Sequence, residues 1–232
     1  MVALPPDYDA DPARFAANQA TTRLYAQSDV HGDVARRYAG LGYERVADIG
    51  GGNGALARQL AALGVPAVVV DRARYVADAP RPAVRADAAA LPFADEAFDG
   101  AAALWMLYHL DRPETALAEM GRVVRPGGLV AVCAPSRFND PEAADLLPGW
   151  GEPASFDAEN GEEILRSVFA DVTVERWDAP LVHLPDRAAV AVYLRGRGLS
   201  AAEAERDADL LPAPLEITKR GMLAYARVSR YA

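Results

Sequence analysis

A run of glycines between two patterned segments is the part of this sequence best suited to chemistry. Residues 45–49 are mostly apolar, and they lead into Gly50-Gly51-Gly52-Asn53-Gly54 and then into a helical pattern. Glycine lets the chain turn sharply and lets a ligand approach the backbone closely. The unpaired N–H groups of the following helical turn favour a carboxylate or a phosphate. The segment therefore predicts a ligand-binding turn, whose spacing also satisfies the dinucleotide fingerprint.

Three aspartates accompany the glycine turn. Asp48 lies two residues before the first glycine, Asp71 ends the next apolar run, and Asp87 follows a third short run. A carboxylate at the end of the second strand can accept hydrogen bonds from both hydroxyls of a ribose, a device that NAD-binding proteins also use. The acids and glycines together indicate a nucleoside-containing cofactor.

The string Asp48-x-Gly50-x-Gly52-x-Gly54 resembles motif I of the class I S-adenosylmethionine (SAM) dependent methyltransferases. In that family this acid helps to hold the methionine end of SAM, usually indirectly, and the acid that Asp87 matches meets the adenine. The Arg-Pro-Gly-Gly turn at 125–128 follows in the family's order, and the resemblance covers about residues 42–135. It implies SAM as cofactor, S-adenosylhomocysteine as product, and these cofactor-binding residues: Asp48, Gly50, Gly51, Gly52, Asn53, Gly54, Asp71, Arg72, Asp87, Ala88 and Leu104.

The segment after the fourth predicted strand, residues 104–110, resembles the stretch that faces the transferred methyl group in small-molecule methyltransferases. Trp105 and Met106 would form an aromatic and thioether wall there. His109 has a side-chain type whose ordinary pKa of about 6.5 suits a general base. We expect His109 to take a proton from the acceptor or to orient it, the alternative being a histidine that hydrogen-bonds the next loop. Tyr108 is the second catalytic candidate, and the N-terminal helix would add Tyr25 and His31 to the substrate pocket.

The pattern of apolar residues predicts an α/β fold with a doubly wound, mostly parallel seven-stranded sheet of the Rossmann-like type. The expected strands are 45–49, 67–70, 83–85, 98–104, 129–134, 172–177 and 222–228, the last one antiparallel at or near the sheet edge. The expected helices are 12–41, 53–63, 113–124, 157–168 and 186–199. We divide the chain into an N-terminal helical cap, 1–41, and a SAM-binding domain, 42–232. Lid insertions are expected near 136–156 and 185–215, and the acidic stretch 201–214 is expected to be mobile.

Composition limits the partners. The 232 residues carry 24 Lys and Arg against 33 Asp and Glu, a formal charge of −9, which disfavours a nucleic-acid partner. The single cysteine lies in an apolar run, the three histidines lie far apart, and neither forms a metal-binding spacing. No apolar stretch is long enough to span a membrane, and the N-terminus is unlike a signal peptide. We expect a cytoplasmic protein, monomer or homodimer, with a small-molecule substrate.

Two other functions are compatible with these residues. An NAD-dependent oxidoreductase would use the glycines and Asp71, although it leaves Asp48, Asp87 and the 125–128 turn unexplained. A non-methylating relative would bind SAM for another purpose, as a cyclase or a binding module, because fold does not fix function. The leading hypothesis is in-line transfer of a methyl group to an oxygen, nitrogen or carbon atom of a natural-product or metabolic intermediate.

Overall fold

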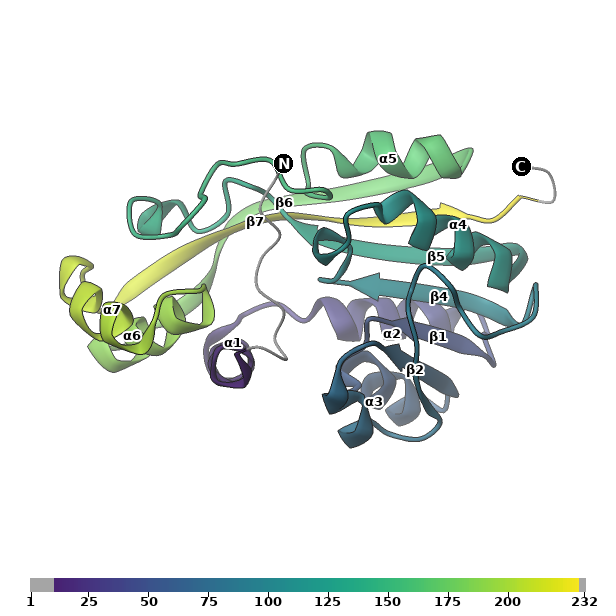
Figure 1. Ribbon diagram of the computed structural model, residues 1–232, viewed down its shortest axis with the longest axis horizontal. Helices are drawn as coiled ribbons and strands as arrows, with labels where there is room; N and C mark the ends of the chain where they lie inside the picture. Colours follow the sequence, from purple (N-terminus) through teal and green to yellow (C-terminus); the bar gives the residue numbers. More distant parts are fainter. Residues whose placement is uncertain (1–10, 230–232) are drawn as a thin grey trace.

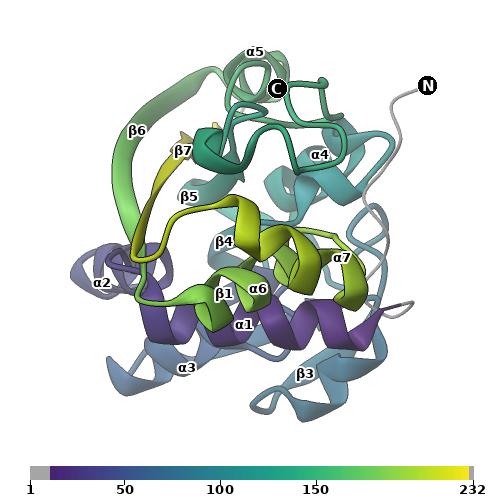
Figure 2. The ribbon, with the colours of Figure 1, turned by 90° about the vertical axis from the view of Figure 1, so that its left-hand side faces the viewer.

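The structure, a computed structural model, describes residues 11–229. A seven-stranded sheet with the order β3-β2-β1-β4-β5-β7-β6 forms its centre. Figure 1 shows these strands side by side from β2 to β6, and Figure 2 labels β3. The first five strands of the chain pair in parallel, and β7 runs antiparallel between β5 and β6. This confirms the predicted doubly wound sheet. The strands are β1 Val46–Ile49, β2 Ala67–Asp71, β3 Ala83–Arg85, β4 Phe98–Leu104, β5 Val124–Pro135, β6 Asp171–Leu184 and β7 Leu215–Arg227.

Helices cover both faces of the sheet (Figure 1). Helices α4 and α5 pack on one face, and α2 and α3 pack on the other, each pair closing its own apolar cluster. The α-helices are α1 Pro12–Tyr25, α2 Val30–Gly40, α3 Ala55–Ala62, α4 Pro113–Val123, α5 Gly161–Val168, α6 Arg187–Gly196 and α7 Ala201–Asp207. Short 3-10 helices are η1 Arg74–Asp78, η2 Leu107–His109, η3 Pro141–Ala143 and η4 Ala208–Leu210.

The predicted single helix over 12–41 is wrong, because the chain breaks between Tyr25 and Val30. Ala26 takes an extended conformation and forms an antiparallel bridge with Val182 of β6. Asp29 then caps the second helix by accepting a 3.0 Å hydrogen bond from the N–H of Gly32. An extended pairing followed by an N-cap acid ends one helix and starts another.

The expected cap therefore consists of two helices with different neighbours. Helix α2 packs against α3 under the sheet, whereas α1 lies beside α6, as Figures 1 and 2 both show. Residues 1–10 of the predicted cap lie outside the described residues.

The stretch 201–214, predicted to be mobile, is ordered as α7 and η4. Ser200 and Glu203 form a reciprocal capping box at the start of α7. Ala204 and Ala208 are buried in an apolar cluster with α6, the C-terminal end of β6 and the N-terminal end of β7. The acidic composition of this stretch concealed its buried alanine face. Together, α1, α6 and α7 form a second, smaller packed unit beside the carboxyl ends of the parallel strands (Figure 2).

Within residues 11–229, no helix is long and apolar enough to cross a membrane. In the same described part of the chain, no three His, Cys, Asp or Glu side chains gather in a way that could hold a metal ion.

Candidate functional site

One pocket of about 1430 Å³ lies across the carboxyl ends of β1 to β5. In open α/β sheets this edge is where ligands bind. The pocket has two halves, one at the glycine turn and the other beside β6 and β7, and α1 lines it as well. Of the residues predicted from the sequence, it is lined by Gly50, Gly51, Gly52, Asn53, Asp71, Arg72, Asp87, Ala88, Leu104, Trp105, Met106, Tyr108, His109 and His31.

The glycine turn requires glycine for two different reasons. Gly50 has a φ of +64°, and a Cβ there would lie 2.6 Å from Cγ of Met106. Gly52 has a φ of +57°, but a Cβ there would meet nothing closer than the Tyr75 ring at 3.5 Å. Left-handed backbone is costly for residues with a Cβ. Gly50 thus makes room for the pocket wall, while Gly52 presents bare backbone to the cavity.

Asp71 is fixed at the end of β2 by two main-chain donors. Its Oδ2 accepts a 2.8 Å hydrogen bond from the N–H of Gly52, and its Oδ1 accepts one of 2.8 Å from Ala73. These two bonds hold both carboxylate oxygens in place at the end of β2. The carboxylate is therefore oriented before a ligand binds.

Asp48 lies beneath the turn and does not line the pocket. Its side chain is buried and accepts a 3.3 Å hydrogen bond from the N–H of Ala57 in α3. A Cβ on Gly51 would lie 2.5 Å from this carboxyl group. Burial, assisted by the nearby Asp71 charge, raises the pKa of Asp48 to about 7. Asp48 thus supports the turn from below, next to Gly51, which agrees with the indirect role that the resemblance implies.

Asp87 and Ala88 follow β3 at the edge of the pocket. Asp87 is exposed, and its Oδ1 accepts a 2.9 Å hydrogen bond from the N–H of Ala89. Ala88 is buried against the apolar cluster of the α4 face. An oriented carboxylate next to a packed alanine gives one polar and one apolar contact, which suits the edge of a flat heterocycle.

The wall after β4 is held in an unusual backbone conformation. Trp105 has a φ of +61°, which is rare for a bulky residue and typical of functional sites. Its N–H donates a 3.0 Å hydrogen bond to the carbonyl of Cys133 in β5, so the pairing of β4 with β5 supports it. Its ring meets Trp177 of β6 edge-on, with centroids 6.1 Å apart. The two indoles form an aromatic wall in the pocket.

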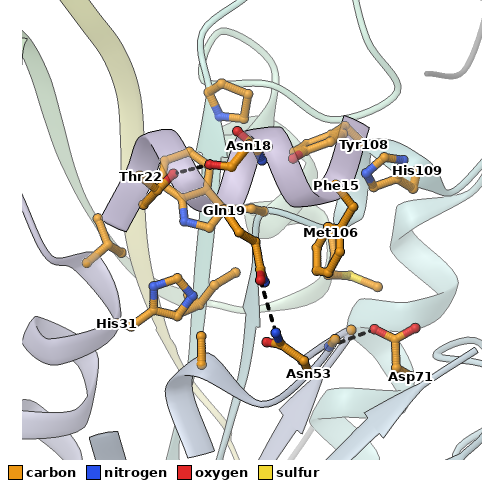
Figure 3. A pocket seen from close by; sticks show the side chains of 18 of the residues that line it. Phe15, Asn18, Gln19, Thr22, His31, Asn53, Asp71, Met106, Tyr108 and His109 are labelled. Atoms are coloured by element: carbon orange, nitrogen blue, oxygen red, sulfur yellow. Dashed lines mark hydrogen bonds between the residues drawn. The ribbon is translucent and has the colours of Figure 1, made fainter. Parts of the chain in front are cut away.

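Tyr108 and His109 belong to η2, directly after that wall. Their rings pack against each other with centroids 4.6 Å apart, and both line the pocket. The N–H of His109 donates a 3.0 Å hydrogen bond to the carbonyl of Met106, which fixes the turn. Figure 3 shows both side chains across the cavity from His31. Burial lowers the pKa of His31, with the Asp29 carboxylate opposing it.

Helix α1 covers the glycine turn, as Figure 3 shows. The side chain of Gln19 accepts a 3.1 Å hydrogen bond from the amide of Asn53. Phe15 stacks on Tyr75 of η1, with ring centroids 4.7 Å apart and planes 13° from parallel. Apolar spacing predicts a helix here but does not indicate that these side chains face the turn. The contact between Gln19 and Asn53 joins residues 34 positions apart, so it depends on tertiary packing.

Two further predicted residues are placed elsewhere. Tyr25 does not line the pocket and packs against the cluster of α6 and α7, because the chain turns into its bridge with β6 at the next residue. Gly54 caps α3 with a φ of +85°, and a Cβ there would lie 2.5 Å from Pro80. Its role is to let the helix start close to the following loop. Neither residue is part of the pocket lining.

Comparison with known proteins gives consistent results. Residues 47–132 match the model of a family described as a methyltransferase domain. A demethylmenaquinone methyltransferase of Clavibacter sepedonicus is 26% identical over 209 residues, which cover 83% of this chain and 81% of that protein. An uncharacterized methyltransferase of Mycobacterium marinum is 36% identical over 130 residues, 53% of this chain and 50% of that one.

The same fold occurs in solved structures. The crystal structure of the [4+2]-cyclase SpnF superposes with a TM-score of 0.64 at 20% identity, covering 96% of this chain and 94% of that one. The matching segment, 47–132, holds the glycine turn, Asp71, Asp87 and the β4 wall. Over residues 47–132 the chain is similar to a methyltransferase domain. The matched segment supplies much of the glycine half of the pocket, and the rest of the lining comes mainly from α1, from Arg197 after α6 and from β6 and β7.

Proposed function

We propose that this protein is a SAM-dependent methyltransferase for a small-molecule acceptor. The observation that carries the proposal is the single pocket that joins the glycine turn to the aromatic wall. Pockets for one small ligand usually have volumes of about 300–1000 Å³. At about 1430 Å³, this pocket has room for a cofactor and an acceptor next to each other.

The residues of the glycine half suit the parts of SAM. Gly52 offers bare backbone with a positive φ, Asp71 offers oriented carboxylate oxygens for the ribose hydroxyls, and Asp87 with Ala88 suits the adenine edge. Arg72, Asn53 and Leu104 complete this half. Bound SAM would supply an activated methyl group on its sulfonium. The chain then has to hold the acceptor in line with that methyl and keep water out.

The other half of the pocket would position the acceptor. Trp105 and Met106 give it an apolar wall next to the cofactor half, and His31 reaches it from α2. We assign to His109, with Tyr108 beside it, the role of orienting the acceptor or taking its proton. A hydroxyl or ammonium acceptor must lose a proton, so a base within reach of it is needed.

The net charge of −9 supports a small-molecule acceptor over nucleic acid. The relatives' names support the same class, since one acts on a demethylmenaquinone by its name, and another is called an O-methyltransferase. A role in natural-product or intermediary metabolism fits these names. They do not support an NAD-dependent oxidoreductase.

A second function is favoured by one observation, the likeness to a [4+2]-cyclase along 96% of the chain. In that case the same pocket would bind SAM and an acceptor without methyl transfer. Release of S-adenosylhomocysteine separates the two functions. Methylation releases one molecule of S-adenosylhomocysteine for each methylated product, whereas cyclisation releases none.

Isothermal titration tests the proposal directly. SAM and NAD are titrated separately into the wild type and into Asp71→Ala. Micromolar binding of SAM to the wild type, lost in the variant, supports the proposal. Binding of NAD in its place, or of neither cofactor, contradicts it.

A further inference from the structure

Lys219 is the only lysine in a sequence that contains 24 Lys and Arg residues together. Every other basic position is an arginine. This one lysine lies on β7, and its side chain, 16% exposed, lines the half of the pocket away from the glycine turn. Arginine stays protonated in proteins, whereas lysine can lose its proton when it is buried. Lysine at this one position therefore provides a basic side chain that can lose its proton, which arginine would not.

The contacts of Lys219 come from two other elements. Its Nζ donates hydrogen bonds to Oδ1 of Asp140, in the loop after β5, and to the hydroxyl of Tyr193 in α6, at 3.1 Å in the second case. The Asp140 side chain is 2% exposed. Its Oδ2 also lies 3.1 Å from Nε of Arg197, just after α6. One buried carboxylate therefore faces two cations.

The charges of this group leave Lys219 as the member that titrates. Burial opposes ionisation of Asp140, but the Lys219 and Arg197 charges outweigh it and lower the pKa of Asp140. Arg197 keeps its proton, so an Asp140–Arg197 pair stays balanced when Lys219 becomes neutral. Burial, with the Arg197 charge, lowers the pKa of Lys219 to about 8, although Asp140 and Glu142 oppose this. The adjacent Arg220 is itself paired with Asp178 of β6 at 3.0 Å.

The strand register places Lys219 next to the aromatic wall. Gly221 is paired with Trp177, and Lys219 is paired with Ala179, two residues further along the antiparallel pair of β6 and β7. Residues two apart in a strand face the same side at a spacing of about 7 Å. Trp177 in turn contacts Trp105 after β4. Lys219 thus leaves β7 on the same face of the sheet as Trp177, and both side chains line the pocket together with Trp105.

We propose that Lys219 takes the proton from an acidic hydroxyl of the acceptor, a phenol or an enol conjugated to a flat ring system. This rests on the proposed methyltransferase function. The neutral amine accepts the proton of the O–H group, and the oxygen keeps the bonding pair. That pair forms the new bond to the methyl carbon as the bond from carbon to sulfur breaks, its electrons remaining on sulfur. The ammonium group of Lys219 later releases the proton to water.

The acidity of the acceptor follows from that of Lys219. A phenol such as tyrosine has an ordinary pKa of about 10, close enough for an amine with a pKa near 8 to deprotonate it within a pocket. A hydroxyl group with the acidity of water, pKa about 15.7, is out of its reach. The ammonium group then stabilises the oxyanion that it has created, held in place by Asp140 and Tyr193.

The single lysine permits a direct test in the intact protein. With lysine labelled by carbon-13 at Cε, the spectrum contains one side-chain signal, whose titration reports Lys219. An Arg36→Lys variant adds a reference lysine at a position whose side chain is 62% exposed. We expect the Lys219 signal to titrate near pH 8 and the reference near the ordinary 10.5. A Lys219 midpoint equal to or above that of the reference overturns the proposal.

The probe for the acceptor class is phenol, with its methyl ether anisole as the matched neutral compound. Both are added at about one pH unit above the Lys219 midpoint, where the amine is mostly neutral and phenol, with a pKa of about 10 like the tyrosine hydroxyl, still keeps most of its proton. We expect phenol to return the signal to its ammonium position and anisole to leave it unchanged. An unchanged signal with both compounds, or an equal shift with both, overturns the proposal. Calorimetry with SAM is independent of these readouts, so failure of the proposed function would appear there and not here.

Discussion

The main-chain N–H of Gly52 donates a 2.8 Å hydrogen bond to Oδ2 of Asp71. This bond joins the turn after β1 to the end of β2. The two strands are parallel neighbours, and all of β1 from Val46 to Ile49 is paired with β2. The backbone that would pass under the cofactor and the acid that would hold its ribose are therefore one unit. A change to either residue should affect the other.

Asp71→Asn tests this unit more gently than removal of the side chain. The amide keeps one oxygen for the N–H of Gly52 but loses the charge and the second acceptor. A hydrogen bond to a charged group contributes about 1.5–3 kcal/mol, so we expect SAM affinity to fall roughly 10- to 100-fold in calorimetry. Asp145→Asn, an exposed carboxylate outside the pocket, is the control and should bind SAM normally. Equal affinity of Asp71→Asn and wild type would contradict the assignment.

Gly50→Ala and Gly64→Ala form a matched pair. Both glycines have a positive φ, +64° and +76°, but a Cβ at Gly64 would meet nothing within 4 Å. The left-handed backbone alone costs about 1–2 kcal/mol in both variants. At Gly50 the Cβ would also lie 2.6–2.9 Å from three atoms of Met106, which should add about 1–3 kcal/mol.

We expect urea unfolding to show this difference, and SAM binding to be lost in Gly50→Ala alone. If the two variants lose equal stability and both bind SAM, the contact of Gly50 with Met106 is not what requires glycine there.

Local signals predicted the glycine half of the site well. A turn, its flanking acids and the strand before it are adjacent in sequence, so the spacing from Asp48 to Gly54 and the position of Asp71 could be recognised without a fold. The seven strands followed from apolar runs for the same reason. Spacing could not give the depth of a side chain, so it did not show that Asp48 is buried under the turn.

The acceptor half depends on contacts between distant segments. Tyr25 has the same helical spacing as Phe15, and only the bridge of Ala26 with β6 turns it away from the pocket. Lys219 lies 79 residues from Asp140 in sequence. The two form a hydrogen bond because β7 and the loop after β5 pack together. No periodicity marks either outcome.

Asp48→Asn should separate stability from function. The pKa of Asp48 is about 7 in the folded protein, against an ordinary value of 3.8. The folded state therefore holds a proton that the unfolded state has released, and stability falls as pH rises from about 4 to 7, by up to about 4 kcal/mol in all. Asparagine keeps an acceptor for the Ala57 N–H and carries no charge.

We expect Asp48→Asn to gain stability over wild type at about pH 8, and to gain much less at about pH 5, where Asp48 is mostly protonated. Urea unfolding at the two pH values measures this. A gain that does not depend on pH would show that Asp48 is not held neutral by burial. SAM affinity, measured at the higher pH, tests whether the charge matters to the cofactor.

His109→Asn and Lys219→Met distinguish the two candidate groups for the acceptor's proton. A general base contributes about 100- to 10,000-fold to rate, so its loss should lower kcat by that much and remove the base limb of the pH profile. We expect that result for Lys219→Met. We expect His109→Asn to raise KM and to keep the base limb, because an orienting residue acts on placement of the acceptor.

S-adenosylhomocysteine release with a phenolic acceptor measures both variants, and calorimetry with SAM confirms that each still binds cofactor. If His109→Asn loses the base limb while Lys219→Met keeps it, the proton goes to the histidine after β4. The ammonium group of Lys219 would then only hold the acceptor oxygen.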